Sequence, residues 1–223
     1  MSGYANPPRI DPGDLRGVID PNGGFMCIIM YWRPDPDAPD PEMPGRKLSM
    51  TTYIPVRRGE PCLCGSGKRY RDCCRREPLW QPICPNPGGR NSGYSLMRSQ
   101  SARFKGVDGV KILGRLGSDR RLRCVDASPR SSFWIWHGDR MVKEEYGILC
   151  FGDIELMRSR TLLVSAMSDL RMEMLLAFLQ EIAGDLLGEP RVTYDKMPAI
   201  DKRTGKMRTQ RPVRPPAPRK GKA

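Results

Sequence analysis

The chain has 223 residues and a formal net charge of +13, with 38 Lys and Arg against 25 Asp and Glu. Apolar residues make up 39% of it, and its 23 Gly and 22 Pro indicate long stretches of turn and loop. No apolar run approaches the roughly 18 residues of a membrane-spanning helix, and residues 1–20 lack the basic and apolar regions of a secretory signal. We therefore expect a cytoplasmic protein with a core of moderate size.

Basic residues concentrate in two segments. Residues 191–223 contain 11 Lys and Arg but only 2 acids, and residues 57–76 contain 7 basic and 2 acidic residues. A basic tail attracts polyanions by releasing their counterions. The alternative is a disordered end that only keeps the protein in solution.

The N-terminal part of the chain predicts two strands. Residues 1–24 are rich in Pro, Gly and Asp without periodicity, and we expect them to be coil. A continuous apolar run at 25–32 predicts a strand that is buried on both faces. An acidic, Pro-rich linker follows at 34–44, and alternating apolar residues at 48–56 predict a second strand. We expect these two strands, in 25–57, to pair across the linker.

The middle of the chain divides into three segments. After a Cys-rich segment at 58–78, residues 79–105 carry several Pro, Gly and Ser, and we expect them to form a long surface loop. Residues 106–190 show the patterns of a small α+β unit. The elements expected there are a short helix over 107–116, strands at 122–125 and 133–136, and a hairpin of 147–157 with 161–166.

The clearest element is the last helix. Ser168 is a favourable N-cap, and apolar residues then recur at every fourth position from Leu170 to Leu186, beside a second apolar row. The Gly-Glu-Pro sequence at 188–190 is a typical stop signal. Residues 191–223 are expected to form a disordered basic tail. We therefore predict an α+β fold, in which a small Cys-rich knuckle accompanies a sheet-and-helix domain.

Four cysteines lie within thirteen residues, in the spacing C-x-C-x8-C-C. In a reducing cytosol such a cluster favours a metal site over disulfides. Four thiolates form the closed tetrahedral shell of structural zinc, and the glycines on either side of Ser66 allow a sharp turn. A segment this short buries too little apolar surface to fold alone, so Zn2+ would supply its folding free energy. The candidate ligands are Cys62, Cys64, Cys73 and Cys74.

This segment resembles the SEC-C motif, the zinc-binding module at the C-terminus of the preprotein translocase motor SecA. The family pattern P-C-x-C-G-S-G-K-K-Y-K-x-C-[CH] is matched from Pro61 to Cys74, with Arg69 and Arg71 in place of two lysines. The resemblance implies that the four cysteines are the zinc ligands. It covers the knuckle and not the rest of the chain.

The resemblance also implies a kind of partner. Such knuckles dock on the export chaperone SecB, and ribosome contact is attributed to them as well, so we expect a zinc-binding interaction protein with a SecB-like chaperone or the ribosome as partner. Motor activity is not implied, because Cys62 and Arg69 stand where a phosphate-binding loop needs Gly and Ser or Thr. The residues expected to meet an acidic partner are Lys68, Arg69, Arg71, Arg75 and Arg76, with Tyr70 as an apolar anchor beside them.

An RNA-binding protein is the main alternative, and it would use the zinc knuckle and the basic tail. The tail lacks aromatic residues from Met197 onward, which weakens this alternative. Trp134 and Trp136 can stack on bases if they lie on an open strand face. Packing in the core is the favoured interpretation of both.

A third possibility is an enzyme, and we expect no catalytic site. His137, the one histidine, has no nucleophile motif near it. A shell of four cysteines also leaves no open metal position for water. Cys84 is either a spare ligand or a free thiol, of which we favour the free thiol, and we expect Cys27, Cys124 and Cys150 to pack in the core.

Overall fold

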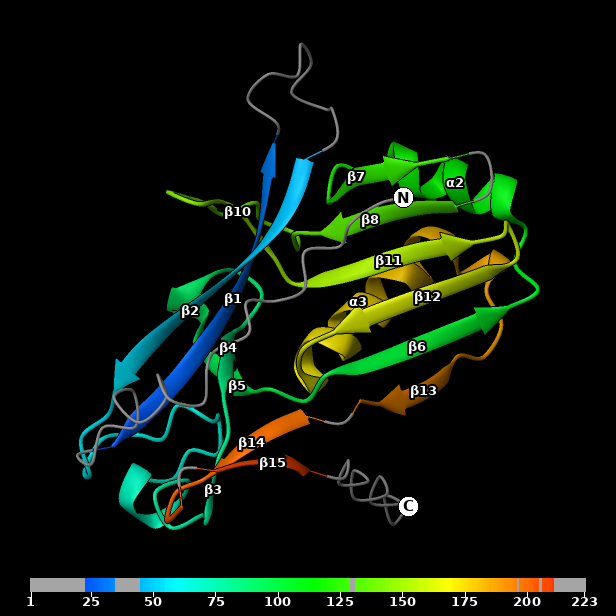
Figure 1. The fold of residues 1–223 in the computed structure, drawn as a ribbon. Helices are drawn as coiled ribbons and strands as arrows, with labels where there is room; N and C mark the ends of the chain where they lie inside the picture. The colour runs from blue at the N-terminus through cyan, green and yellow to red at the C-terminus, as the bar shows by residue number, and fades with distance from the viewer. Residues whose placement is uncertain (1–22, 35–44, 129–130, 196, 205, 211–223) are drawn as a thin grey trace, which may run out of the picture.

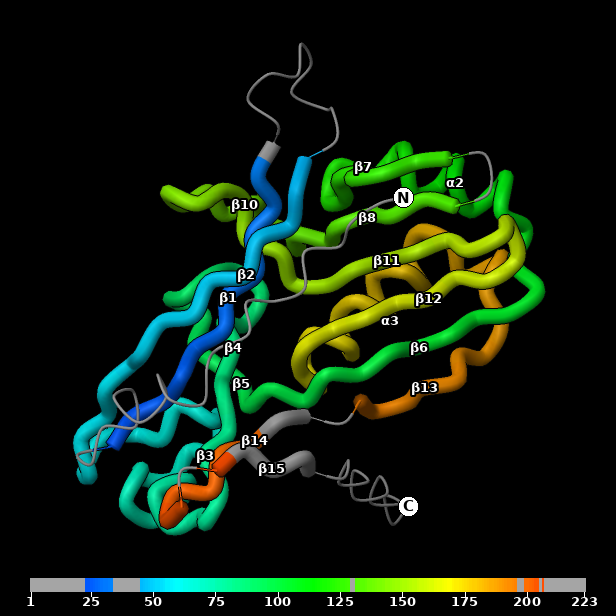
Figure 2. The backbone as a smooth tube through the Cα atoms, viewed as in Figure 1, coloured from blue at the N-terminus to red at the C-terminus, as the bar shows by residue number. Residues whose placement is uncertain are grey.

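The computed structural model of the protein describes residues 23–34, 45–128, 131–195, 197–204 and 206–210. This part of the chain has three β-sheets and two α-helices, with one main apolar core cluster and two smaller ones, so the predicted α+β class is confirmed (Figures 1 and 2). The coil expected at 1–24 and the linker expected at 34–44 lie almost wholly outside the described residues.

The first sheet is built around a long antiparallel pair, β1 (Gly24–Pro34) and β2 (Gly45–Pro55), which match along their whole length. Both predicted strands and their pairing are confirmed. β1 is buried on both faces, because consecutive apolar side chains point to opposite faces and Phe25 and Met26 are only 2% and 8% exposed. The other strands are β4 (Ile83–Pro85), β5 (Tyr94–Leu96), β9 (Lys143–Glu144) and β10 (Gly147–Cys150), in the order β5-β4-β1-β10-β9.

The second sheet is antiparallel, in the order β13-β6-β12-β11-β8-β7, and helices α2 and α3 cover one of its faces (Figure 1). Ile154 and Val164 are fully buried, whereas Glu155, on the opposite face, is half-buried. The predicted short helix and the two strands after it correspond to α2, β7 and β8. The bounds are β6 (Gln100–Lys105), α2 (Gly109–Ser118), β7 (Leu122–Ala127), β8 (Ser131–Trp136), β11 (Gly152–Met157), β12 (Thr161–Ala166), α3 (Asp169–Ala183) and β13 (Arg191–Tyr194).

Helix α3 begins where the sequence predicts. The hydroxyl of Ser168 accepts a hydrogen bond from the backbone N–H of Arg171 at 3.3 Å, as an N-cap does. The helix is shorter than the stop signal at 188–190 indicates, because the α-helix ends at Ala183 and tightens into the 3-10 turn η3 (Gly184–Leu186). The apolar spacing continues through that turn, so periodicity alone overestimates the length.

The prediction of a long surface loop at 79–105 is wrong, because this segment contains β3 (Leu79–Trp80), β4, β5 and β6. The first three strands have two or three residues each, too few for an alternating pattern to be visible. β4 and β5 pair with each other, but their other contacts in the sheet are distant in the sequence: β4 also pairs parallel to β1, with Cys27 opposite Ile83.

The prediction of a disordered tail at 191–223 is wrong for the first part of this segment, which contains three strands. β13 lies beside β6 in the second sheet. β14 (Met197–Asp201) and β15 (Met207–Gln210) form a hairpin that pairs with β3 in a third sheet. Residues 211–223 lie outside the described residues. The hairpin places a C-terminal segment next to the Cys-rich knuckle (Figure 1).

The hairpin predicted from 147–157 and 161–166 is confirmed for β11 and β12 alone. β10 belongs to the first sheet, and Phe151, which joins β10 to β11, is 1% exposed. The chain crosses from one sheet to the other here, and both sheets contribute to one core cluster. The sequence does not reveal the crossing, because β10 and β11 read as one mainly apolar run.

Candidate metal centre and docking surface

The knuckle is a tight hairpin of backbone that follows β2. Pro61 and Arg69 form an antiparallel bridge, and the N–H of Cys62 donates to the carbonyl of Lys68 at 2.8 Å. The turn between them has positive φ angles at Gly65 (80°) and Gly67 (70°), a conformation that favours glycine. A short 3-10 helix, η1 (Tyr70–Asp72), then leads to the second cysteine pair. This path brings the first and last cysteines of the motif together.

The four candidate ligands converge. The Sγ atoms of Cys62, Cys64, Cys73 and Cys74 all lie within 4.8 Å of one another. The Cys64–Cys73 separation is 3.5 Å and the Cys73–Cys74 separation is 3.9 Å, and all four are free thiols. Tetrahedral metal–sulfur bonds of about 2.3 Å place sulfur atoms about 3.8 Å apart. The cluster therefore fits a metal ion with four thiolate ligands.

Burial and close spacing shift the pKa values of three thiols of the cluster. Burial raises the pKa of Cys62, and burial together with hydrogen bonds and charge from Cys62 and Cys64 raises the pKa of Cys74. Burial also acts to raise the pKa of Cys64, but hydrogen bonds from Ser66 and the neighbouring thiols outweigh it and lower that pKa to about 7. Four thiolates this close repel one another, and a divalent cation would offset their charge.

Tyr70 was expected to be an apolar anchor for a partner, and this prediction is wrong. Its side chain is 3% exposed, and its ring contacts Phe25 of β1 with a centroid separation of 5.6 Å. Its hydroxyl accepts a hydrogen bond from the backbone N–H of Gly24 at 3.2 Å. Tyr70 therefore fixes the knuckle to the core and does not reach the surface.

Lys202 is a residue of the centre that the sequence analysis missed. Its Nζ donates hydrogen bonds to the backbone carbonyls of Cys74 and Arg75, and its backbone N–H donates to Pro78 at 3.0 Å. Burial lowers the pKa of its ammonium group. The available signal was the Asp-Lys-Arg-Thr-Gly sequence at 201–205, whose composition is typical of a hairpin turn.

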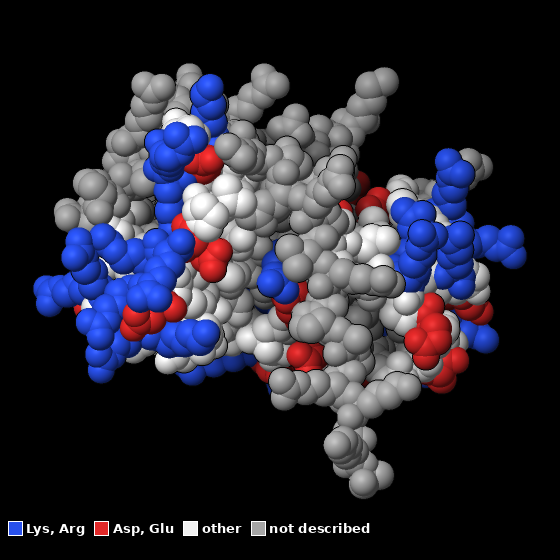
Figure 3. Space-filling model, turned by 90° about the horizontal axis from the view of Figure 1, so that it is seen from below, with Lys and Arg blue, Asp and Glu red and all other residues white. Residues whose placement is uncertain are grey.

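Basic side chains gather at the knuckle end of the molecule, and Figure 3 shows them as a dense group with few acids between them. Asp72 forms ion pairs with Arg71 at 3.3 Å and with Arg76 at 3.2 Å, whereas Lys68 and Arg69 have no ion pair among the described residues. Arg75, predicted to contact a partner, is partly buried. The exposed basic residues of this surface are Arg57, Arg58, Lys68, Arg69, Arg71, Arg76, Arg203 and Lys206.

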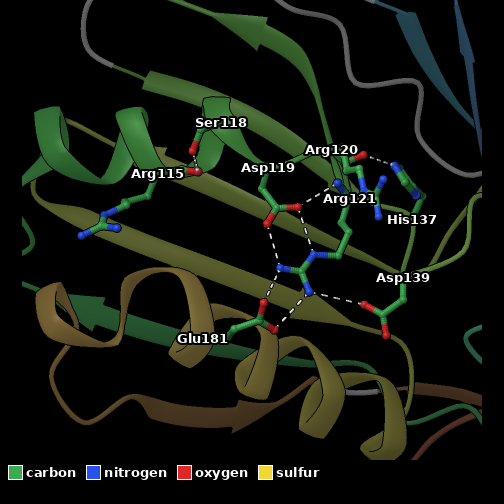
Figure 4. A network of polar contacts seen from close by, with 8 residues as sticks. All are labelled: Arg115, Ser118, Asp119, Arg120, Arg121, His137, Asp139 and Glu181. Atoms are coloured by element: carbon green, nitrogen blue, oxygen red, sulfur yellow. Dashed lines mark hydrogen bonds and ion pairs between the residues drawn. The ribbon is translucent and has the colours of Figure 1, made fainter.

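A second polar cluster lies between β7, β8 and α3 and lines an open depression (Figure 4). Arg121 pairs with Asp119 at 2.8 Å, with Glu181 at 2.7 Å and with Asp139 at 3.5 Å, and its guanidinium lies 4.5 Å from the ring centre of Phe178. One arginine thus forms ion pairs with carboxylates from three segments of the chain. The cluster ties the start of β7 to α3.

His137 lies beside this cluster but contacts the backbone. Its Nε2 lies 2.9 Å from the carbonyl of Arg120, and its Nδ1 has no hydrogen-bond partner in the described part of the chain. Burial lowers the pKa of the imidazole, so the ring is neutral near pH 7. Among the described residues, no nucleophilic side chain hydrogen-bonds to the imidazole.

Trp136 and Cys84 are buried, and Trp134 is partly buried. Trp136 is 1% exposed and stacks on Phe178 of α3 at 6.0 Å, which confirms core packing. Trp134 is partly buried, and its ring lies toward Gly117 of α2. Cys84 is fully buried and is not part of the four-cysteine cluster.

The comparisons with known proteins identify the knuckle. Residues 58–76 match the family model of the SEC-C motif, and the four clustered cysteines lie inside the match. The rest of the chain matches no family. No curated protein and no solved structure matches the chain. Residues 58–76 are therefore a SEC-C motif within a larger fold. None of the helices in the described residues is long and apolar enough to cross a membrane.

Proposed function

We propose that this protein is a zinc-binding interaction protein whose knuckle docks on an acidic partner. The observation that carries the proposal is the convergence of four cysteine Sγ atoms within 4.8 Å inside a SEC-C motif. Zinc is favoured over other metals because four thiolates at tetrahedral spacing suit it. When bound, zinc would hold the two ends of the knuckle together and stabilise it.

The chemistry of the centre supports docking and not catalysis. Four cysteines fill a tetrahedral shell, which leaves no position for a substrate or an activated water. The exposed charges of Lys68 and Arg69 lie beside the centre and are available to an acidic surface. By resemblance to SecA-type knuckles, we propose that this surface belongs to a SecB-like chaperone or to the ribosome, in the cytoplasm.

Affinity capture from native cytosol tests this proposal. The intact protein is compared with a Cys62→Ser/Cys64→Ser variant and with Cys124→Ser, which removes a half-exposed thiol outside the cluster. We expect the intact protein and Cys124→Ser to retain the chaperone or ribosomal components, and the double variant to lose them. Equal retention by all three proteins would contradict docking through the knuckle.

A further inference from the structure

Three kinds of contact fix the C-terminal hairpin to the knuckle and to the strand after it: side-chain hydrogen bonds, a backbone hydrogen bond and strand pairing. Lys202 bonds the carbonyls of Cys74 and Arg75 through its side chain, and Pro78 through its backbone. β14 pairs with β3, which places Ile200 opposite Trp80. These two side chains are 4% and 5% exposed and belong to one apolar cluster. The turn after β14 therefore has a defined place against the second half of the SEC-C motif.

This turn adds positive charge to the surface of the knuckle. Arg203 and Lys206 are exposed, and neither forms an ion pair with another described residue. Arg203 directly follows Lys202, whose Nζ lies 3.3 Å from the carbonyl oxygen of Arg75. The turn that carries these charges therefore adjoins the motif, although more than a hundred residues separate them in the sequence.

The composition of this surface favours phosphate as its ligand. Tyr70, the one aromatic residue of the motif, is buried and does not contribute to this surface. The large apolar side chains exposed in the described part of the chain all lie elsewhere: Val110, Tyr146, Leu170 and Val192. Protein interfaces depend on apolar or aromatic anchors, whereas binding to a nucleic-acid backbone needs mainly cations. Arginine predominates here, and its guanidinium binds phosphate in a two-point geometry.

We infer that the knuckle and the β14–β15 turn form one composite surface that binds the phosphate backbone of RNA. This inference rests on the proposed function and names the chemistry of its partner. The metal centre fixes the backbone at Cys74, and Lys202 ties the turn to that backbone, so cations from both segments meet the same strand of phosphates. Backbone contacts carry little sequence information, so the binding has little base specificity.

The test measures binding of the full-length protein to a short, fluorescein-labelled, single-stranded RNA of mixed sequence by anisotropy, over a series of KCl concentrations. The test variant is Arg203→Ala/Lys206→Ala. The control is Arg103→Ala/Arg191→Ala, which removes two exposed arginines that lie opposite each other on β6 and β13 of the second sheet. Both variants lower the net charge equally, and metal content and circular dichroism verify their folding.

We expect the test variant to bind RNA at least several-fold more weakly, and its slope of log affinity against log salt to fall by about 0.7 for each lost phosphate contact. The control variant should keep the affinity of the intact protein to within about twofold. Equal weakening of both variants would overturn the inference, because binding would then follow net charge alone.

A second probe separates this inference from the docking proposal. Poly-L-glutamate offers the charge of an acidic protein without phosphate. If it displaces the labelled RNA as well as unlabelled RNA does, or if no RNA binding is detected while the cysteine-dependent capture of a chaperone persists, the inference fails and the docking proposal stands. If the cysteine variants keep every partner, the docking proposal fails.

Discussion

The hydroxyl of Tyr70 accepts a hydrogen bond from the backbone N–H of Gly24 at 3.2 Å, and this bond joins the knuckle to the first strand of the core. The carbonyl of the same glycine accepts a hydrogen bond from the indole N–H of Trp80 at 2.9 Å. One residue at the start of β1 therefore holds both the SEC-C motif and the β3 strand that supports the C-terminal hairpin. The knuckle is anchored in the fold and is not a flexible appendage.

Tyr70→Phe tests this anchor. The substitution keeps the ring against Phe25 but leaves the buried N–H of Gly24 without its acceptor, so we expect the free energy of unfolding to fall by about 1–2 kcal/mol. Urea denaturation measures it. The control is Tyr146→Phe, because Tyr146 is 37% exposed and its substitution should change stability by less than about 0.5 kcal/mol. Equal stability of both variants would contradict the anchor.

Lys202→Met tests the link between the C-terminal hairpin and the metal centre. The variant keeps a long apolar side chain but removes the donors to the carbonyls of Cys74 and Arg75. We expect faster hydrogen exchange at the amides of β14 and β3, with the second sheet unchanged. Lys206→Met, which changes an exposed lysine in the same hairpin, should leave exchange as it is. Unchanged exchange in Lys202→Met would show that strand pairing alone holds the hairpin.

The Arg121 cluster predicts how stability depends on pH. Hydrogen bonds from Arg121 hold the pKa of Asp119 below its usual range. Because that pKa is depressed in the folded protein, the pair stabilises the fold above the ordinary Asp pKa of about 3.9. The stabilisation is lost as the pH falls through the lower pKa of the folded state.

We therefore expect Arg121→Met to lower the free energy of unfolding at pH 7 by about 1–3 kcal/mol, and to lower it less at pH 3. Urea denaturation at both pH values measures the difference. Arg115→Met is the control, because its ion pair with Asp185 is exposed and 3.5 Å long and contributes little. A loss for Arg121→Met that is the same at both pH values would contradict the role of Asp119.

The sequence predicts those parts of the molecule whose signals are local. The apolar run of β1, the alternation of β2 and the cap of α3 at Ser168 each depend on neighbouring residues, and the structure confirms them. The four-cysteine cluster is predicted for the same reason, because its spacing lies within one short segment.

The failures involve contacts between distant segments. β4 is three residues long, and its place in the first sheet depends on its pairing with β1, more than fifty residues earlier. Tyr70 belongs to the motif whether its side chain is exposed or buried. Only its contact with Phe25 in the folded protein shows that it is buried. Lys202 lies in a segment whose basic composition indicates a tail, and its role depends on carbonyls 127 and 128 residues away. Composition and periodicity carry no information about such pairs.

The central claim is that Cys62, Cys64, Cys73 and Cys74 hold one zinc ion. X-ray absorption at the zinc edge, together with elemental analysis of protein purified under reducing conditions, tests it most directly. We predict one zinc per chain with four sulfur ligands at about 2.3 Å, retained in Cys124→Ser and lost in Cys62→Ser/Cys64→Ser. A protein that contains no metal, or zinc bound mainly through nitrogen and oxygen, would contradict the claim.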